Sequence, residues 1–142
     1  MRVTNIDTLS AYLDRLITEN IKLYFFEKDS LDEKANHQKL LIKEVKGKIV
    51  ELLVESLENR SYIYLEEHRT FDENSIVEQL EELIRNDINI GEADRARLEE
   101  TKKSEPNLER MVVNEKRLRK ANEGRAANKN NIDKIFKRIV EK

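Results

Sequence analysis

The stretch KANEGRAANKNNIDKIF at residues 120–136 decides how this chain is expected to fold. Its residues have helical spacing, but Asn122, Arg125 and Lys129 occupy positions where a packed helix usually carries leucine. Heptad spacing through the C-terminal third selects Leu108, Met111, Glu115, Leu118, Asn122, Arg125, Lys129, Ile132, Phe136 and Ile139. Six of these ten residues are large and apolar, and the polar ones lie in the middle of the series. The environment of that polar group is therefore the main question the sequence raises.

The composition favours helices over sheets and loops. The chain has 142 residues with three glycines and one proline, and 39% of its residues are charged. Long surface helices account for this balance best. We therefore predict an all-α fold, an antiparallel bundle of four to five helices with a long C-terminal helix, forming a single domain over residues 1–142.

Local signals give approximate helix boundaries. The first helix is expected to begin at Thr4 or Asn5, and the second to run from Leu31 or Lys34 to Leu57. A capping box of Ser75 and Glu78 opens a third helix. A loop is expected at residues 86–91 (NDINIG), followed by a short helix at 92–103 and a last helix at 105–140. The segment RSYIYLEEHRTF at residues 60–71 is interpreted as a helix continuation or as an extended connector with aromatic anchors.

Charge is distributed unevenly along the chain. Residues 101–142 contain 13 Lys and Arg against 6 Asp and Glu, a net +7, which leaves −9 for residues 1–100 because the total is −2. The two parts are expected to attract each other inside the fold or across a dimer. The alternative is that the basic part meets an external anion, such as phosphate or nucleic acid.

Three interpretations of the polar group remain open. The helix emerges into solvent there, or the residues form a buried ion-pair layer that fixes helix register, or they line a cationic pocket for a phosphate, carboxylate or acidic sugar. If Arg125 and Lys129 are buried they need carboxylate partners, because an unpaired buried charge costs several kcal/mol. The sequence offers Glu115 on the same face as a partner, and Asp14 or Glu19 in the first helix. The candidate anion-binding residues are Asn20, Glu115, Asn122, Arg125 and Lys129.

Two short motifs resemble a known family. LDRLITENIKL at residues 13–23 and NEGRAANKNNID at residues 122–133 are similar to the two ends of a small helical family of unknown function in bacteria, some of whose members lie beside surface-polysaccharide genes. The resemblance covers about a sixth of the chain. It implies an all-helical fold in which the two termini pack together, and it implies no known activity.

Several classes of function find no sequence support. The chain has no cysteine and two histidines, neither of them in a Glu-x-x-His arrangement, so no metal or cofactor is expected. It has no Gly-rich phosphate-binding motif and no nucleophile elbow. No apolar stretch is long enough to cross a membrane, and no signal peptide is recognisable, so a cytoplasmic location is expected.

These observations favour a non-enzymatic function. We expect a small cytoplasmic assembly or accessory protein that acts through its helical faces, with a homodimer as the expected oligomer. An anion-binding protein or enzyme, with a small anionic ligand between the first and last helices, is the alternative. Nucleic-acid binding through the basic C-terminal part is a weaker alternative, because acidic residues interrupt the basic ones there.

Overall fold

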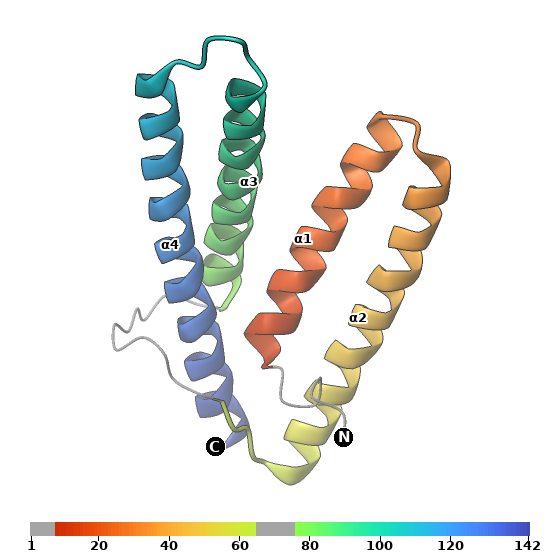
Figure 1. Cartoon of the computed structure of the whole chain (residues 1–142). Helices are drawn as coiled ribbons and strands as arrows, with labels where there is room; N and C mark the ends of the chain where they lie inside the picture. The colour runs from red at the N-terminus through yellow and green to blue at the C-terminus, as the bar shows by residue number, and fades with distance from the viewer. Residues whose placement is uncertain (1–7, 65–75) are drawn as a thin grey trace.

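The computed structural model describes residues 8–64 and 76–142, and all of its regular structure is helical (Figure 1). The expected all-α fold is confirmed, with a long C-terminal helix of 33 residues. At about 1.5 Å per residue this helix is about 50 Å long. The four helices are α1 (Leu9–Lys28), α2 (Asp32–Asn59), α3 (Ile76–Thr101) and α4 (Leu108–Val140).

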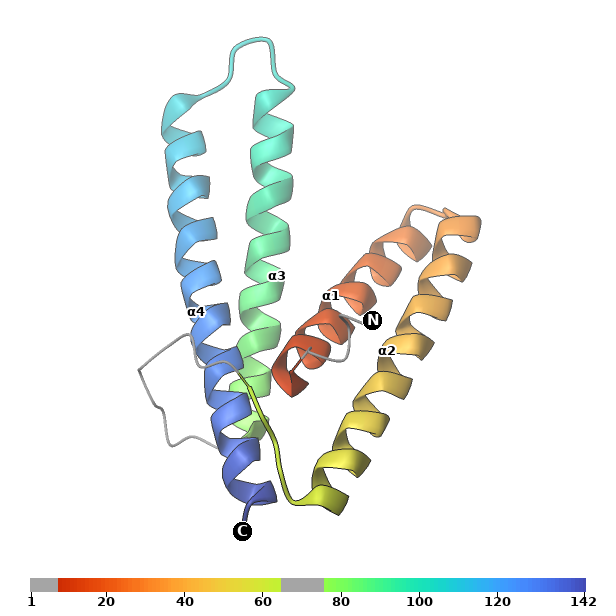
Figure 2. The same cartoon turned by 60° about the horizontal axis from the view of Figure 1, so that its bottom comes forward.

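The helices form two antiparallel hairpins that meet at one end. The α1–α2 hairpin and the α3–α4 hairpin diverge away from the end where the C-terminus lies (Figures 1 and 2). Helix α1 contacts α2 on one side and both α3 and α4 on the other. Helix α2 therefore lies on the far side of α1 from the second hairpin, and much of its surface faces away from the rest of the molecule.

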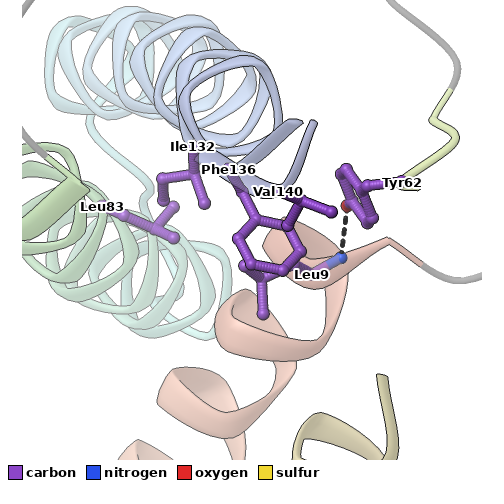
Figure 3. Packing of buried hydrophobic residues seen from close by; sticks show 6 residues of the cluster. All are labelled: Leu9, Tyr62, Leu83, Ile132, Phe136 and Val140. Carbon is purple, nitrogen blue, oxygen red and sulfur yellow. Dashed lines mark hydrogen bonds between the residues drawn. The ribbon is translucent and has the colours of Figure 1, made fainter. Parts of the chain in front are cut away.

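The hydrophobic core lies where the hairpins meet. Leu83 of α3 and Ile132 of α4 are completely buried there, and Phe136 packs edge-to-face on Tyr62 at a centroid distance of 4.7 Å (Figure 3). Helix α2 adds partly buried side chains from its C-terminal half, Ile49, Leu52 and Leu53. The core joins both hairpins, since its buried members are Leu9, Tyr62, Leu83, Ile132, Phe136 and Val140.

The prediction of a loop at residues 86–91 is wrong, because α3 continues through it to Thr101. Asp87 is buried within this stretch and lies against Arg125 of the last helix, and Ala93, two residues beyond the stretch, is also buried. Asn, Asp and Gly disfavour a helix interior by no more than about 1 kcal/mol each, and tertiary contacts outweigh a preference of that size. The expected fifth helix at 92–103 is therefore the second half of α3, and the described helices number four.

The predicted helix starts need smaller corrections. Helix α4 begins at Leu108 instead of residue 105, because the side chain of Asn107 accepts a hydrogen bond from the Arg110 amide and so caps the helix. Helix α1 begins at Leu9, with Thr8 as its cap. The expected starts at Thr4 or Asn5, like the Ser75 half of the capping box, lie outside the described residues.

The segment after α2 contains the expected aromatic anchor. Arg60 adopts a left-handed conformation (φ 47°) that ends α2, and residues 61–64 are not helical. Tyr62 is buried and stacks against Tyr64 at 5.9 Å. In its described part the segment is therefore a connector anchored by an aromatic residue and not a continuation of α2; residues 65–71 lie outside the described residues.

None of the described helices is both long enough and apolar enough to span a membrane.

Candidate functional site

Arg125 and Lys129 of α4 meet two buried carboxylates from other helices. Arg125 donates to Oδ2 of Asp14 in α1 through Nε, at 2.9 Å, and through Nη2. The same Nε lies 3.5 Å from Oδ1 of Asp87 in α3, and Nζ of Lys129 lies 3.9 Å from Asp14 Oδ2. The Asp14 and Asp87 side chains are only 4% and 1% exposed, so this charge cluster joins three helices in the interior.

The two carboxyl groups of the charge cluster differ in pKa. Burial opposes ionisation of Asp14, but hydrogen bonds from Asp87 and Arg125 outweigh it and lower the pKa of Asp14 below its ordinary value. Burial, together with the hydrogen bond and the charge of Asp14, raises the pKa of Asp87 to about 8. Asp87 is therefore the protonated member at neutral pH. Its proton accounts for Asp14 Oδ1 and Asp87 Oδ2, which have no other hydrogen-bond partner.

The charge cluster contains only two of the five predicted site residues. Arg125 and Lys129 come together around Asp14, which was one of the three carboxylates expected as their partners. Asn20 is exposed, and its side chain donates to the Leu16 carbonyl oxygen of its own helix at 2.7 Å. The prediction that Asn20 meets Arg125 and Lys129 in one pocket is therefore wrong.

The remaining two predicted residues, Glu115 and Asn122, lie in solvent. Glu115 accepts a hydrogen bond from Arg97 Nη1 of α3 at 3.2 Å. Asn122 is exposed in a shallow groove along α4 that Glu115 and Ala126 also line. The predicted polar face thus divides in two, because its first part is hydrated and its second part is an interior ion-pair layer.

Ion pairs also connect the acidic and basic parts of the chain elsewhere. Besides the charge cluster, Arg117 of α4 pairs with Glu92 of α3 and donates to Asn89 at 3.0 Å. These pairs confirm the expected attraction between residues 1–100 and 101–142 inside the fold. Exposed pairs of this kind contribute little stability, about 0–1 kcal/mol each. Their main effect is to neutralise part of the positive charge of α4.

Another buried carboxylate, Asp133 of α4, caps the start of α1. Asp133 accepts hydrogen bonds from the Ser10 amide at 3.0 Å, from the Ser10 hydroxyl at 2.5 Å and from the Tyr62 hydroxyl at 2.5 Å. The Tyr62 hydroxyl in turn accepts from the Leu9 amide at 2.7 Å (Figure 3). Burial raises the pKa of Asp133 despite these donors, and burial together with the Asp133 charge raises the pKa of Tyr62. This cap holds the two ends of the chain's helical part together.

Buried amides join α3 to α4. Asn128 donates to Gln79 Oε1 at 3.0 Å and to Glu82 Oε2 at 2.9 Å, and it accepts from Asn86 Nδ2 at 2.7 Å. Gly124 lies one turn away, where a Cβ would be only 2.7 Å from the same Asn86 nitrogen. An added Cβ would therefore displace the Asn86 amide, which donates to Asn128. The amides fix the register of the two helices.

Sequence reasoning missed Asp87, Asp133 and the amides because each is polar and polar residues are usually exposed. A signal was present for the amides. Gln79 and Asn86 are seven residues apart on the same helix face as the core residue Leu83, and Asn128 precedes Ile132 by one turn. Asp87 carried no such signal, since it belonged to a stretch that was interpreted as a loop.

The outward face of α2 is a different kind of surface. It carries exposed apolar side chains, Leu40, Val50, Val54 and Leu57. In residues 8–64 and 76–142, no three His, Asp or Glu side chains gather as potential metal ligands.

Comparisons with family models, curated proteins and solved structures gave no match to this chain. The resemblance of the two end motifs to an uncharacterised bacterial family therefore stays a prediction.

Proposed function

We propose that this chain is a non-enzymatic cytoplasmic assembly or accessory protein, and that it self-associates as a homodimer through its helical faces. The observation that carries the proposal is the uncovered apolar face of α2. Four apolar side chains of this helix are each about half exposed or more: Leu40, Val50, Val54 and Leu57. Apolar surface gathered on one helix face is typical of a protein interaction site.

The buried polar groups support an architectural role for the interior. The charge cluster, the Asp133 cap and the amides each connect two or three helices, and most of their hydrogen bonds are made within the fold. An anion site at Arg125 and Lys129 finds less support, since both cations already face Asp14. Nucleic-acid binding finds less support for a similar reason, because basic residues such as Arg117 are paired with acidic ones.

Light scattering over about 1–100 μM protein tests the proposal. We expect a dimer, and we expect the variant Val50→Lys/Val54→Lys to be monomeric with unchanged helix content by circular dichroism. Ile139→Lys is the matched control, because Ile139 is also half exposed but lies on α4. A wild-type protein that is monomeric throughout this range would refute the proposal.

A thermal-shift titration separates the anion alternative. Inorganic phosphate should leave the melting temperature of the wild type and of Arg125→Ala equally unaffected. Stabilisation of the wild type alone would favour an anion site instead.

A further inference from the structure

We propose that the α1–α2 hairpin swings as one body about the end where the two hairpins meet, and that a contact between Arg95 and Phe25 is the latch that holds it against α3. The guanidinium carbon of Arg95, in α3, lies 3.4 Å from the centroid of the Phe25 ring, in α1. Self-association plays no part in this motion, because the latch and the pivot both lie within one copy of the chain.

The pivot is the first part of α1, where the two hairpins are joined by buried polar contacts. The Ser10 amide donates to Asp133 of α4 at 3.0 Å. Four residues farther along α1, Asp14 accepts a hydrogen bond from Arg125 Nε at 2.9 Å. Both carboxylates are buried, and the hydrophobic core lies at the same end of the molecule. Residues 9–14 are therefore fixed to the α3–α4 hairpin.

Each hairpin is also held together internally, beyond the pivot. In the first hairpin, the buried side chain of Gln38 in α2 donates to the backbone carbonyl oxygen of Glu19 in α1 at 3.0 Å. In the second, Arg97 of α3 donates to Glu115 of α4 at 3.2 Å. The helices within a hairpin stay side by side while the hairpins diverge from each other (Figures 1 and 2). Each hairpin should therefore move as a unit.

Space remains between α1 and α3 from the pivot to the latch. Asp87, Gly91 and Arg95 follow one another at intervals of four residues, so they lie on the same side of α3. Asp87 is hydrogen-bonded to Asp14 of α1, and Arg95 reaches Phe25. A Cβ added to Gly91, midway between them, would meet no atom of residues 8–64 or 76–142 within 4 Å beyond its own helix backbone. The two helices are therefore joined at both ends of this stretch and not closely packed between them.

Apolar side chains beside this space are only partly covered. Ile84 and Ile88 precede Arg95 by eleven and seven positions, so they belong to the side of α3 that faces α1. They are nevertheless 37% and 42% exposed. Little close packing is therefore lost when the hairpin swings away, and the latch contact decides how far the two hairpins lie apart. Release of the latch exposes these isoleucines further.

A distance between the two hairpin tips measures the swing. Glu33 lies near the tip of the first hairpin and Lys102 at the tip of the second, and both are exposed. The chain has no cysteine, so Glu33→Cys/Lys102→Cys can be spin-labelled at these two positions alone. Double electron–electron resonance then gives the distribution of distances between the labels. Dilution into unlabelled protein removes distances between copies.

The variant Arg95→Ala, made in this labelled chain, removes the latch. We expect it to raise the ratio of longer to latched distances by about two- to fivefold, the range that an exposed cation–π contact supplies. Phe25→Leu should have the same effect. The double variant Phe25→Leu/Arg95→Ala should resemble either single one, because all three lack the same contact. Arg95→Lys should keep more of the latched population than Arg95→Ala, since a lysine ammonium also binds over a ring.

Arg97→Ala is the matched control, because Arg97 lies two residues from the latch but pairs with Asp94 and Glu115 inside its own hairpin. It should leave the distance between the hairpin tips unchanged. A second label pair, Glu81→Cys/Glu99→Cys, spans about 27 Å within α3 and should not change in any variant.

Two results would overturn the inference. One is a distance distribution between the tips that is the same in wild type and Arg95→Ala. The other is an equal shift in Arg97→Ala, which would show that any lost arginine on α3 loosens the molecule. Circular dichroism checks that each variant keeps the helix content of wild type, so a longer distance with full helix content reports a swing of the hairpin and not unfolding.

Discussion

Replacing Asp87 with asparagine should remove most of the pH dependence of stability between pH 6 and pH 9. The pKa of Asp87 is raised from 3.8 to about 8 by burial and by its hydrogen bond to Asp14. Between these two values the folded protein binds a proton that the unfolded chain has released. The free energy of unfolding therefore falls as pH rises toward 8, and it levels off above that value. Asparagine keeps a hydrogen-bond donor facing Asp14 and cannot ionise.

The expected size of the effect follows from the raised pKa. For one group with a folded-state pKa of about 8, the wild type loses about 3 kcal/mol of unfolding free energy between pH 6 and pH 9. At about 2–4 °C per kcal/mol, this corresponds to a fall of about 6–12 °C in melting temperature. The lowered pKa of Asp14 does not contribute, since its effect is complete well below pH 6. Asp87→Asn should match the wild type at pH 6 and exceed it at pH 9.

Urea unfolding at fixed protein concentration, followed by circular dichroism at unit steps of pH, measures this effect. Other groups that titrate in the window are shared by wild type and variant, so their contributions cancel in the difference. Asp94→Asn is the matched control, because Asp94 lies on the same helix but is about half exposed and should retain the wild-type slope. Parallel pH profiles for wild type and Asp87→Asn would refute the shared proton in the charge cluster.

Three further predictions test the packing. Gly91→Ala should raise the unfolding free energy by about 1 kcal/mol because its Cβ meets open space, whereas Gly124→Ala should bring no such gain because its Cβ would crowd α3; urea midpoints compare the two. Phe136→Ala should lower the free energy of unfolding by about 3–5 kcal/mol, whereas Ile139→Ala, at a half-exposed position, should lower it by less than about 0.5 kcal/mol. Equal losses of stability in thermal melts would contradict the assignment of Phe136 to the core. Tyr62→Phe should cost about 1–3 kcal/mol, because its hydroxyl joins the start of α1 to a buried carboxylate; an unchanged unfolding midpoint would disprove that link.

Patterns within each segment were enough to predict the helices. Apolar spacing located α1, α2 and α4. The start of α4 differs from the prediction by a few residues because Asn107 caps the helix. The failure at residues 86–91 has the opposite cause. There the local preferences of Asn, Asp and Gly are correctly described, but contacts with α4 are stronger than those preferences.

The candidate site was predictable only in part. The sequence predicted that a buried Arg125 needs a carboxylate partner, because a buried charge must be paired, and it indicated Asp14 as a candidate. The choice of Asp87, and the exclusion of Asn20 and Glu115, depended on how far each helix is rotated and how the hairpins diverge.

The sequence by itself determined that this chain is helical, where most of its helices lie and that its acidic and basic parts attract each other. These properties depend on residues within one or two turns and on total charge. Only the tertiary structure decided which polar residues are buried together and which face of α2 is left uncovered. Asp14 and Arg125 are 111 positions apart, and nothing in the residues near either one specifies their meeting. That contact depends on the packing angle between the two hairpins. Core residues from both hairpins together determine this angle.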